Sequence, residues 1–356
     1  MKGYVIPRNL KLTEFPAALI STPEPVPSTS KEILITVHSA ALNFFDILQI
    51  QGKHQSRPAF PWIAGSEFSG VMAPNSPVPE GCNWIPGKTR LFGSGLGAFA
   101  EVVKTDWEQC HELPEGMGFD EAAGLSVTFA TSYAALVNRA AIKKGDFLLI
   151  HAAAGGVGIA ALQIGKALGA TVIATASASK LDVCKRFGAD NVLDYNQDGW
   201  QKKVMEITKG HGADVVYDPV GMIVPSLKCV AWGARVVVVG FAAGAIEKVS
   251  FTPAPPFASS DLVLNSIKIP ANLILLKSIA VTGVFWGAYA ANEPEAIPIV
   301  WRDLLKLFNE KRIQGVVFDK VYNGLESVPE GLRALGARET WGKAIVRVRK
   351  DPTAKL

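Results

Sequence analysis

The stretch that decides the fold is FLLIHAAAGGVGIAALQIGKALGATVIATASASK, residues 147–180. An apolar run is followed by a glycine cluster, a helical apolar pattern, a β-branched run, and then hydroxyl side chains with a lysine. This order predicts a strand, a tight turn, a helix and a second strand. The N–H groups at a helix start carry partial positive charge, and glycines remove the Cβ atoms that would block a close approach. The turn therefore suits a pyrophosphate.

The glycine cluster matches the dinucleotide fingerprint G-x-G-x-x-G/A incompletely. Ala153 stands at the first glycine position, and Gly155 and Gly158 stand at the other two. Taken alone, such a turn is equally well explained by close packing of a helix against a strand. Apolar segments that alternate with helical patterns make the cofactor reading stronger, and the six expected strands are 147–150, 171–176, 191–195, 214–218, 235–239 and 278–285. We expect them to be buried on both faces of a doubly wound α/β parallel sheet with right-handed crossovers.

The end of the second strand of this sheet indicates which dinucleotide is bound. An NAD-selective site places an acidic residue there, about 20 residues past the glycines, to bind the ribose 2′-hydroxyl. This chain has Ser177 at that point and Lys180 shortly after it. A hydroxyl and an ammonium attract a 2′-phosphate, whereas a carboxylate repels it. We therefore expect NADPH, the alternative being that Ser177 caps the next helix and Lys180 is merely solvated.

Composition describes a globular chain of about two domains. The 356 residues are 49% hydrophobic and 19% charged, and the net charge of +4 is not concentrated in any Lys/Arg block. Nucleic acid binding is therefore not expected. The four cysteines lie far apart without metal spacing, which favours a reducing compartment. We find no secretory or transit segment near the N-terminus and expect a cytoplasmic protein.

Residues 271–292 imitate a membrane span, but Lys277 and two glycines interrupt the run. A short helix that leads into a buried strand is the expected structure there, and no membrane partner is expected.

The β-prone segments outside the parallel sheet indicate a second domain. Short β-prone runs at 32–42, 67–72 and 98–104 are separated by Pro, Gly, Asn and Ser, and a helical pattern at 295–313 precedes β-prone segments near the C-terminus. The last segment is expected to return to the first domain. We expect a discontinuous β-rich domain, 1–126 and 288–356, and a dinucleotide-binding domain, 127–287.

Segments along nearly the whole chain resemble one family. They include ALNFFDILQIQGKHQ (41–55), AGSEFSGV (64–71), GLGAFAEVV (95–103), AAAGGVGIAALQIGKALGA (152–170), GADVVYDPVG (212–221), PANLILLK (270–277), VTGVFWGAY (281–289) and ALGARETWGKAIV (334–346). The chain resembles the zinc-independent NADPH:quinone oxidoreductase (zeta-crystallin-like) branch of the medium-chain dehydrogenase/reductase superfamily. The resemblance implies a Rossmann domain, a GroES-like catalytic domain and a homodimer joined through the last strand of the cofactor sheet. The alternative for that strand is an edge covered by its own chain.

The resemblance also implies site residues. The pyrophosphate contacts would be Gly155, Gly156, Val157 and Gly158, and the 2′-phosphate would be surrounded by Ser177, Lys180 and Tyr195. The nicotinamide half would be lined by Thr128, Phe241, Val284, Phe285 and Trp286, with Lys343 reaching the cofactor from the C-terminal segment. Asn43 and Asp46 match the floor of the substrate cleft. For Asp46, a buried hydrogen-bonding role is at least as well supported as a chemical one.

No zinc site is expected. The positions that match zinc ligands in zinc-dependent relatives hold Asn43, Ser66 and, approximately, Gly124, and none of these is a good zinc ligand. Hydride from NADPH then needs an acceptor that is already electron-poor.

Three functions fit these expectations. The first is an NADPH-dependent quinone oxidoreductase. The second is an enoyl or alkenal reductase, including one that acts in trans in polyketide assembly. The third is an NADPH-binding protein with little turnover, crystallin-like or RNA-binding. An enone also needs a proton at its α-carbon. Related reductases often carry a tyrosine two places after the aspartate, where this chain has Leu48, so Tyr289 and His54 are the remaining candidates. The long segment 247–268 is expected either to border the substrate cleft as a flap or to be a surface insertion.

Overall fold

The computed structural model describes residues 1–240, 269 and 271–349 of the chain. These residues divide into two compact units. The first unit contains Met1–Ala130 and the C-terminal stretch from Leu305, and the second contains Thr131–Leu304. The division falls within α3 (Leu125–Tyr133) and α10 (Ala296–Asn309). The domain limits 126/127 and 287/288 remain a sequence-based proposal.

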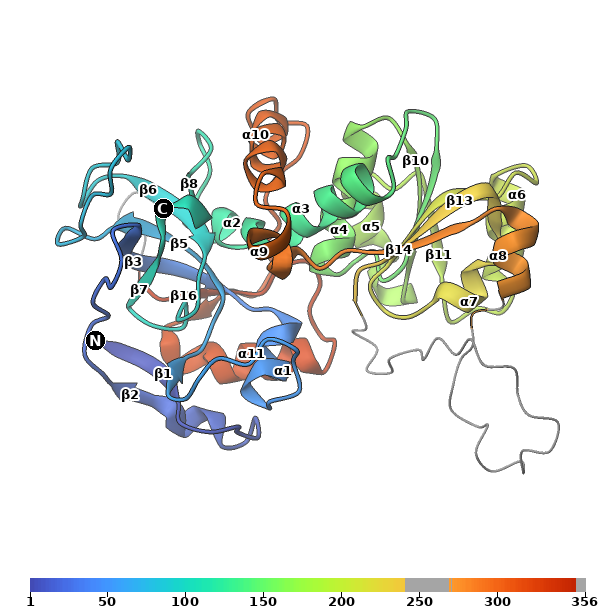
Figure 1. Cartoon of the computed structure of the whole chain (residues 1–356). Coiled ribbons are helices and arrows are strands. Elements are labelled where there is room, and N and C mark those ends of the chain that lie inside the picture. The colour runs from blue at the N-terminus through green and yellow to red at the C-terminus, as the bar shows by residue number, and fades with distance from the viewer. Residues whose placement is uncertain (241–268, 270, 350–356) are drawn as a thin grey trace. The chain divides into compact units, whose positions relative to one another are not determined.

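The second unit is built on the six-stranded sheet (Figure 1). The strand order is β11-β10-β9-β12-β13-β14, and every neighbouring pair is parallel. The strands are β9 (Phe147–Ile150), β10 (Thr171–Ala176), β11 (Asn191–Asp194), β12 (Ala213–Asp218), β13 (Val230–Val238) and β14 (Ala280–Gly283). The predicted α/β doubly wound fold is confirmed, since the order reverses at β9 as such a fold requires.

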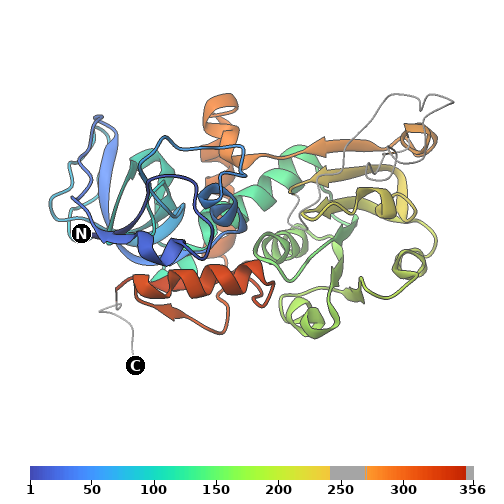
Figure 2. The same cartoon turned by 90° about the horizontal axis from the view of Figure 1, so that it is seen from below.

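Helices cover both faces of this sheet because right-handed crossovers place them there. The crossover helices are α4 (Gly156–Ala167), α5 (Leu181–Arg186), α6 (Trp200–Ile207), α7 (Ile223–Ser226) and α8 (Ala271–Lys277), and α9 (Tyr289–Asn292) follows the last strand. In Figure 2, α6, α7 and α8 lie away from α4 and α5. One buried cluster joins Leu149, Ile173 and Val236 of the strands to Trp200 and Val204 of α6.

The prediction of a strand buried on both faces at 278–285 is wrong. β14 is shorter, lies at the edge of the sheet, and exposes Ala280 and Gly283. Its small side chains cover little of the sheet, and its outer edge has no neighbouring strand among the described residues. The helix that was expected before this strand is present as α8.

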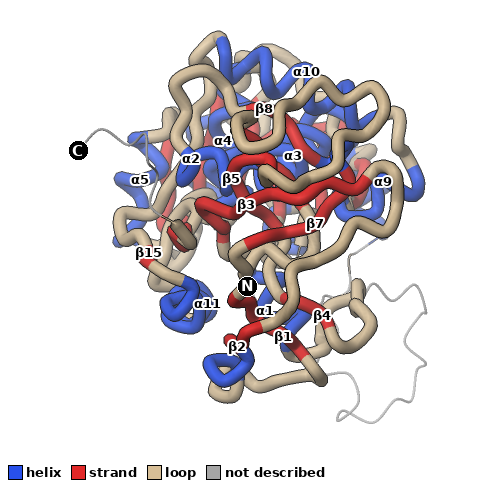
Figure 3. The backbone as a smooth tube through the Cα atoms, turned by 90° about the vertical axis from the view of Figure 1, so that its left-hand side faces the viewer, coloured by secondary structure: helices blue, strands red, loops and turns tan. Residues whose placement is uncertain are grey.

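The first unit is β-rich. A seven-stranded sheet contains β3 (Glu32–Ala41), β5 (Glu67–Met72), β6 (Arg90–Ser94), β7 (Val102–Asp106), β8 (Cys110–Glu112), β15 (Tyr322–Asn323) and β16 (Ile345–Arg347). A smaller sheet has the order β2-β1-β4, with β1 (Lys2–Ile6), β2 (Leu19–Ser21) and β4 (Trp62–Ile63). Its helices are α1 (Phe44–Ile50), α2 (Phe119–Ala123) and α11 (Val328–Gly336). Figure 3 shows β3 between β5 and β7.

The C-terminal segment returns to the first unit, as predicted. β16 pairs antiparallel with β3, with Ile345 opposite Ala41. Val328 and Leu332 of α11 join the same buried cluster as Phe68 of β5. The strand expected at 98–104 begins later, at Val102, because the chain before it forms only an isolated bridge between Ala100 and Gly3. None of the helices in the described ranges has the length and apolarity that a membrane span requires.

Candidate functional site

The first unit holds a buried polar group that we call the Lys343 cluster: Asn43, Glu67 and Lys343. Their exposed fractions are 6%, 0% and 3%. Asn43 precedes α1, Glu67 begins β5, and Lys343 lies just before β16. The Nζ atom of Lys343 is 2.7 Å from Glu67 Oε1, and it donates to Asn43 Oδ1 at 2.7 Å and to the carbonyl of Leu42 at 3.3 Å. The ammonium therefore has two hydrogen-bond acceptors and one ion-pair partner.

Glu67 connects the Lys343 cluster to the start of α3. Its second carboxylate oxygen, Oε2, accepts a hydrogen bond from the backbone N–H of Val127 at 2.7 Å. Burial raises the pKa of Glu67, while the Lys343 ammonium acts in the opposite direction. A carboxylate at the N-terminus of a helix is also stabilised by the helix dipole. One buried side chain thus holds both the lysine and a helix start.

Gly124 leaves the space through which the lysine side chain passes. A Cβ atom at this position would lie 2.9 Å from Cγ of Lys343 and 3.1 Å from its Cβ. Contacts this close force the neighbouring atoms to move. The packing of the lysine at 343 therefore favours a glycine at 124.

Asp46 adjoins the cluster as a hydrogen-bond acceptor. It is 1% exposed, and its Oδ2 accepts from the backbone N–H of Asn43 at 2.8 Å while Oδ1 accepts from the Ser66 hydroxyl at 2.7 Å. Burial raises the pKa of Asp46 to about 7. These contacts are those of a buried hydrogen-bonding residue, the second of the two roles considered for Asp46.

The second unit carries the glycine turn that leads into α4. A Cβ on Gly158 would lie 2.5 Å from the carbonyl oxygen of Ala152 and 2.7 Å from Cα of Ala153. Only a glycine lets the helix begin this close to the end of β9. Gly158 therefore has the close helix–strand packing that the third glycine of a dinucleotide fingerprint provides.

Ser132 of α3 and Tyr217 of β12 stabilise this turn through hydrogen bonds. The Ser132 hydroxyl donates to the carbonyl of Val157 at 2.9 Å and lies 2.8 Å from the Tyr217 hydroxyl. Both side chains are fully buried. They join the first turn of α4 to α3 and β12.

His151 supports the other end of the turn. It is 1% exposed, and its two ring nitrogens lie 3.0 Å from the Thr175 hydroxyl and 2.7 Å from the Ser226 hydroxyl. Burial lowers the pKa of His151 to about 3, so the imidazole is neutral at pH 7. It is a neutral bridge between β9, β10 and α7.

The predicted 2′-phosphate residues lie at adjacent strand ends. Ala176 and Asp194, the last residues of β10 and β11, are register partners, and Ser177 and Tyr195 directly follow them. The Tyr195 N–H donates to the Ala176 carbonyl at 3.3 Å. Lys180 ends the short helix η4 (Ala178–Lys180). The carboxylate in this region, on Asp194, accepts from the backbone and side-chain nitrogens of Asn196.

The predicted nicotinamide residues are distributed over both units. Val284 is buried and Phe285 is half exposed just after β14, and Trp286 begins the turn η5 (Trp286–Ala288). Thr128 belongs to the first unit, where its hydroxyl donates to the Gly124 carbonyl at 2.7 Å. Phe241 lies outside the described residues, as does the predicted flap at 247–268.

Tyr289, one of the two candidate proton donors, is a buried residue of the second unit. It is 3% exposed, its ring centroid lies 4.8 Å from that of Trp286, and the guanidinium carbon of Arg139 lies 5.4 Å from its ring. Burial raises the pKa of Tyr289, with Arg139 acting in the opposite direction. The phenol therefore keeps its proton at neutral pH.

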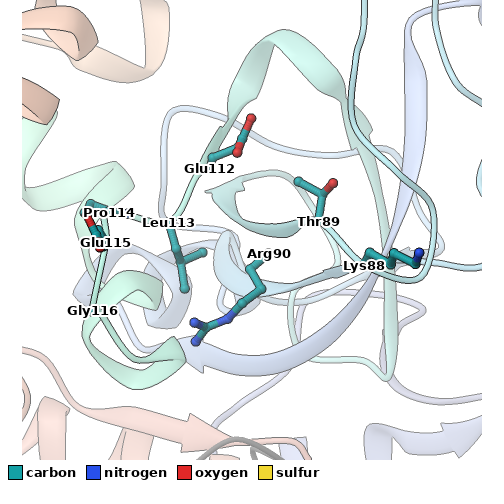
Figure 4. Close-up of a pocket in the computed structure, with 8 residues that line it drawn as sticks. All are labelled: Lys88, Thr89, Arg90, Glu112, Leu113, Pro114, Glu115 and Gly116. Carbon is teal, nitrogen blue, oxygen red and sulfur yellow. The ribbon is translucent and has the colours of Figure 1, made fainter.

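A pocket in the first unit contains none of these residues (Figure 4). It has a volume of about 410 Å³ and lies beside β6 and β8. Its lining residues are Lys88, Thr89, Arg90, Glu112, Leu113, Pro114, Glu115 and Gly116. The side chains of Lys88 and Arg90 point in different directions rather than toward a common point. The pocket is therefore not the candidate site.

Sequence reasoning missed Glu67, Ser132, Tyr217 and His151 as supporting residues. Glu67 had a local signal, because it follows Ser66 in the GSE segment that was compared with a zinc-ligand motif. The hydroxyls of Ser132 and Tyr217 carry no pattern of their own.

Family comparisons agree with both units. Residues 29–115 match the alcohol dehydrogenase GroES-like domain, and residues 156–310 match the zinc-binding dehydrogenase family. The bovine (Bos taurus) quinone oxidoreductase-like protein 2 is 32% identical over 343 residues, which cover 92% of this chain and 88% of that protein.

Two solved structures extend the comparison to three dimensions. The quinone oxidoreductase of Pseudomonas syringae has a TM-score of 0.78 at 27% identity and covers 97% of this chain and 99% of its own. A mycobacterial protein solved in complex with NADPH also has a TM-score of 0.78, at 26% identity, over 98% of this chain and 100% of its own.

The family description implies a zinc ion, and the donor set of this chain does not fit one. Asn43, Ser66 and Gly124, at the positions compared with zinc ligands, supply neither thiolate nor imidazole. Asn43 Oδ1 already accepts from Lys343, and the Ser66 hydroxyl donates to Asp46. Within the described ranges, no group of three His, Cys, Asp or Glu side chains is placed to hold a metal ion.

The glycine turn, by contrast, fits a dinucleotide, because it leads from the parallel strand β9 into the N-terminus of α4 and Gly158 packs as the third glycine of the fingerprint does. Sheet order, glycine turn, GroES-like unit and the bovine relative lead to the same assignment. The chain belongs to the quinone oxidoreductase-like branch of the medium-chain dehydrogenase/reductase superfamily and is an oxidoreductase with an NAD(P)-binding fold.

Proposed function

We propose that this chain is an NADPH-dependent reductase that transfers hydride, without a metal, to a quinone or a similar electron-poor acceptor. The observation that carries the proposal is the Lys343 cluster. Asn43 and Gly124 face a lysine whose ammonium is 2.7 Å from both Asn43 Oδ1 and Glu67 Oε1. A protein without a Lewis acid at this point needs an acceptor that takes hydride unaided, and a quinone is such an acceptor.

The proposed pyrophosphate and 2′-phosphate residues follow β9, β10 and β11 of the second unit's sheet. Bound NADPH supplies the hydride. Gly155, Gly156, Val157 and Gly158 would hold its pyrophosphate at the start of α4, and Ser177, Lys180 and Tyr195 would bind its 2′-phosphate. Thr128, Phe241, Val284, Phe285, Trp286 and Lys343 remain the proposed residues for the nicotinamide half. For Lys343, the three oxygen contacts of its buried ammonium favour an indirect role over direct contact with the nicotinamide.

Asn43, Asp46 and Tyr289 are the proposed residues at the reacting end. Asn43 and Asp46 are held by each other through the 2.8 Å bond between the Asn43 N–H and Asp46 Oδ2. Tyr289 keeps a proton that an enone would need at its α-carbon. The reduced oxygens of a quinone can take protons from water, so a quinone does not depend on Tyr289.

A panel of acceptors tests the proposal. NADPH and NADH oxidation is measured with a benzoquinone, a phenanthrenequinone, a short enal and an acyl-thioester enone. We expect the quinones to be reduced with NADPH. Turnover of the enones alone would replace the quinone assignment, and NADPH binding without turnover of any acceptor would indicate a binding protein.

Lys180→Glu tests the cofactor assignment separately. A carboxylate beside the 2′-phosphate should raise the KM for NADPH by about tenfold or more while changing that for NADH little, since only NADPH carries the extra charge. Lys185→Glu is the matched control, because Lys185 lies on α5 and its ammonium is 3.1 Å from Asp182. Equal effects of Lys180→Glu on both cofactors would contradict the assignment.

Enoyl reduction is the second candidate. A mycocerosic acid synthase-like polyketide synthase of Mycobacterium tuberculosis is 29% identical over 351 residues, which cover 96% of this chain and 15% of that protein. The acyl-thioester arm of the panel addresses this candidate directly.

A homodimer is part of the proposal. β14 ends the parallel sheet, and its outer edge has no strand partner among the described residues. Pairing of β14 with the same strand of a second copy would continue the sheet. Sedimentation equilibrium at micromolar concentration measures the mass, and a monomer at all concentrations would contradict the dimer.

A further inference from the structure

We propose that Lys343 is a positioning residue for the reductase reaction: its ammonium fixes the Asn43 side chain and, through Glu67, the first turn of α3. The inference rests on the proposed function, because it assigns Lys343 an indirect part in that reaction.

The contacts of Lys343 point to a positioning role. Its side chain is 3% exposed, and its ammonium donates to Asn43 Oδ1 and to the Leu42 carbonyl and forms an ion pair with Glu67 Oε1. All of these contacts are made inside the protein. What the ammonium does is determine where these partners lie.

Asn43 is oriented by this ammonium. An ammonium has donors only, so the atom of the Asn43 amide that faces it is the oxygen, and the amide nitrogen must point elsewhere. That nitrogen lies 3.4 Å from the Ala41 carbonyl, a long contact that would hold the side chain weakly by itself. The 2.7 Å bond from Lys343 is the shortest of these contacts, and the other side-chain partner of the amide, Glu67, forms an ion pair with the same ammonium.

The second path runs from Lys343 through Glu67 to α3. One oxygen of Glu67 faces the ammonium and the other accepts from the Val127 N–H at 2.7 Å. The next residue, Thr128, is one of the proposed nicotinamide contacts, and its hydroxyl is bonded to Gly124, which itself lies against the lysine side chain. Loss of the ammonium thus weakens the hold of Glu67 on the helix turn that carries Thr128.

Two variants separate the effect of leaving the Glu67 charge unpaired from the effect of losing the positioning of Asn43. Lys343→Met leaves the Glu67 charge buried and unpaired, so this variant should melt at a lower temperature and lose turnover together. Lys343→Met with Glu67→Gln removes both charges, which should restore much of the melting temperature. If Lys343 positions Asn43, turnover of the double variant should stay about 10- to 100-fold below that of the wild type.

Asn43→Ala provides the matching test of the same path. Alone, it should lower turnover by about the same factor as the double variant. Added to the double variant, it should cause little further loss, because the amide is already misplaced there. If the turnover losses of Asn43→Ala and of the double variant instead multiply in the triple variant, the proposal is overturned.

The control is an exposed lysine–glutamate pair of the same unit. Lys31 Nζ lies 3.0 Å from Glu108 Oε1, and the two side chains are 56% and 52% exposed. Lys31→Met, alone and with Glu108→Gln, should leave both melting temperature and turnover near the wild-type values.

Hydrogen exchange gives a readout that does not require activity. In the folded double variant, peptides covering 41–46 and 124–130 should exchange faster than in the wild type, while peptides of the second unit's sheet should not. A double variant that regains wild-type melting, turnover and exchange would show that Lys343 only balances a charge, and the proposal would be overturned. If the wild type reduces no acceptor, the proposed function fails, and the exchange comparison still decides whether Lys343 orders these two segments.

Discussion

The glycine turn of the second unit and the Lys343 cluster of the first hold their parts by different means. The turn uses main chain: a helix start, a glycine at 158 and adjacent strand ends. The cluster uses side chains from positions 43, 67 and 343, and its order depends on a charge balance. A site built from backbone is therefore made of residues that are close in the sequence. A site built from buried charges is made of residues that are far apart in the sequence and meet only in the fold.

The largest expected effect comes from breaking the charge balance. Lys343→Met should lower the free energy of unfolding by about 3–5 kcal/mol, because the Glu67 carboxylate then remains buried without its partner. Urea unfolding at pH 7 measures the loss. If the free energy of unfolding falls by less than about 1 kcal/mol, the Lys343 cluster does not depend on its charge pair, and the contrast with the glycine turn fails.

Gly158→Val tests the glycine turn, the region built from backbone. The added Cβ would lie 2.5 Å from the Ala152 carbonyl oxygen, so the start of α4 must shift. The affinity for NADPH should fall by about 100-fold, or about 2.7 kcal/mol, as measured by fluorescence titration. Gly118→Ala is the control, since its nearest neighbour, a carboxylate oxygen of Glu121, is 4.0 Å away. Equal affinity of Gly158→Val and the wild type would contradict the prediction.

These two regions also differ in how well the sequence predicted them. The limits of β9 and β10 agree with the predicted strands at 147–150 and 171–176, because apolar periodicity and glycine punctuation are local properties. The β7 strand was misplaced by four residues because Ala100, although β-prone, pairs only as an isolated bridge. Lys343 was assigned to the cofactor by resemblance. Its burial against Glu67 could not be predicted, because 276 positions separate the two residues (343 minus 67).

His151 is a side-chain element within the backbone-built region, and its neutrality makes it sensitive to pH. Its pKa is about 3 when folded and about 6.5 when unfolded, so the unfolded chain binds the proton first as the pH falls. The stability that the neutral imidazole contributes is present above pH 6.5 and is lost progressively below it.

His151→Asn should lower the free energy of unfolding by about 1–3 kcal/mol at pH 7.5, because the Ser226 and Thr175 hydroxyls lose a partner. The difference from the wild type should shrink between pH 6.5 and pH 4, since asparagine does not titrate. Urea unfolding at pH 7.5, 5.5 and 4.5 measures it. A difference that is constant over this range would indicate that His151 has the same pKa in the folded and unfolded chain, and would contradict the prediction.

The smallest effect is expected for Ser132→Ala. This change removes the hydroxyl that donates to the Val157 carbonyl and contacts Tyr217, and it should lower the free energy of unfolding by about 1 kcal/mol. The KM for NADPH should rise about twofold to fivefold, because the first turn of α4 is held less firmly. A larger effect than that of Gly158→Val would reverse the comparison, since it would make side chains the main support of the turn.

The contact between Gly124 and Lys343 restricts the order in which this protein can change over generations. A residue larger than glycine at 124 would meet the lysine side chain at 2.9 Å, so the lysine must shift when position 124 is substituted. Replacement of the lysine first would leave the Glu67 carboxylate buried without its ion-pair partner. A new side chain at position 124, a metal ligand included, is therefore accommodated with the least disturbance when 67 and 343 change together.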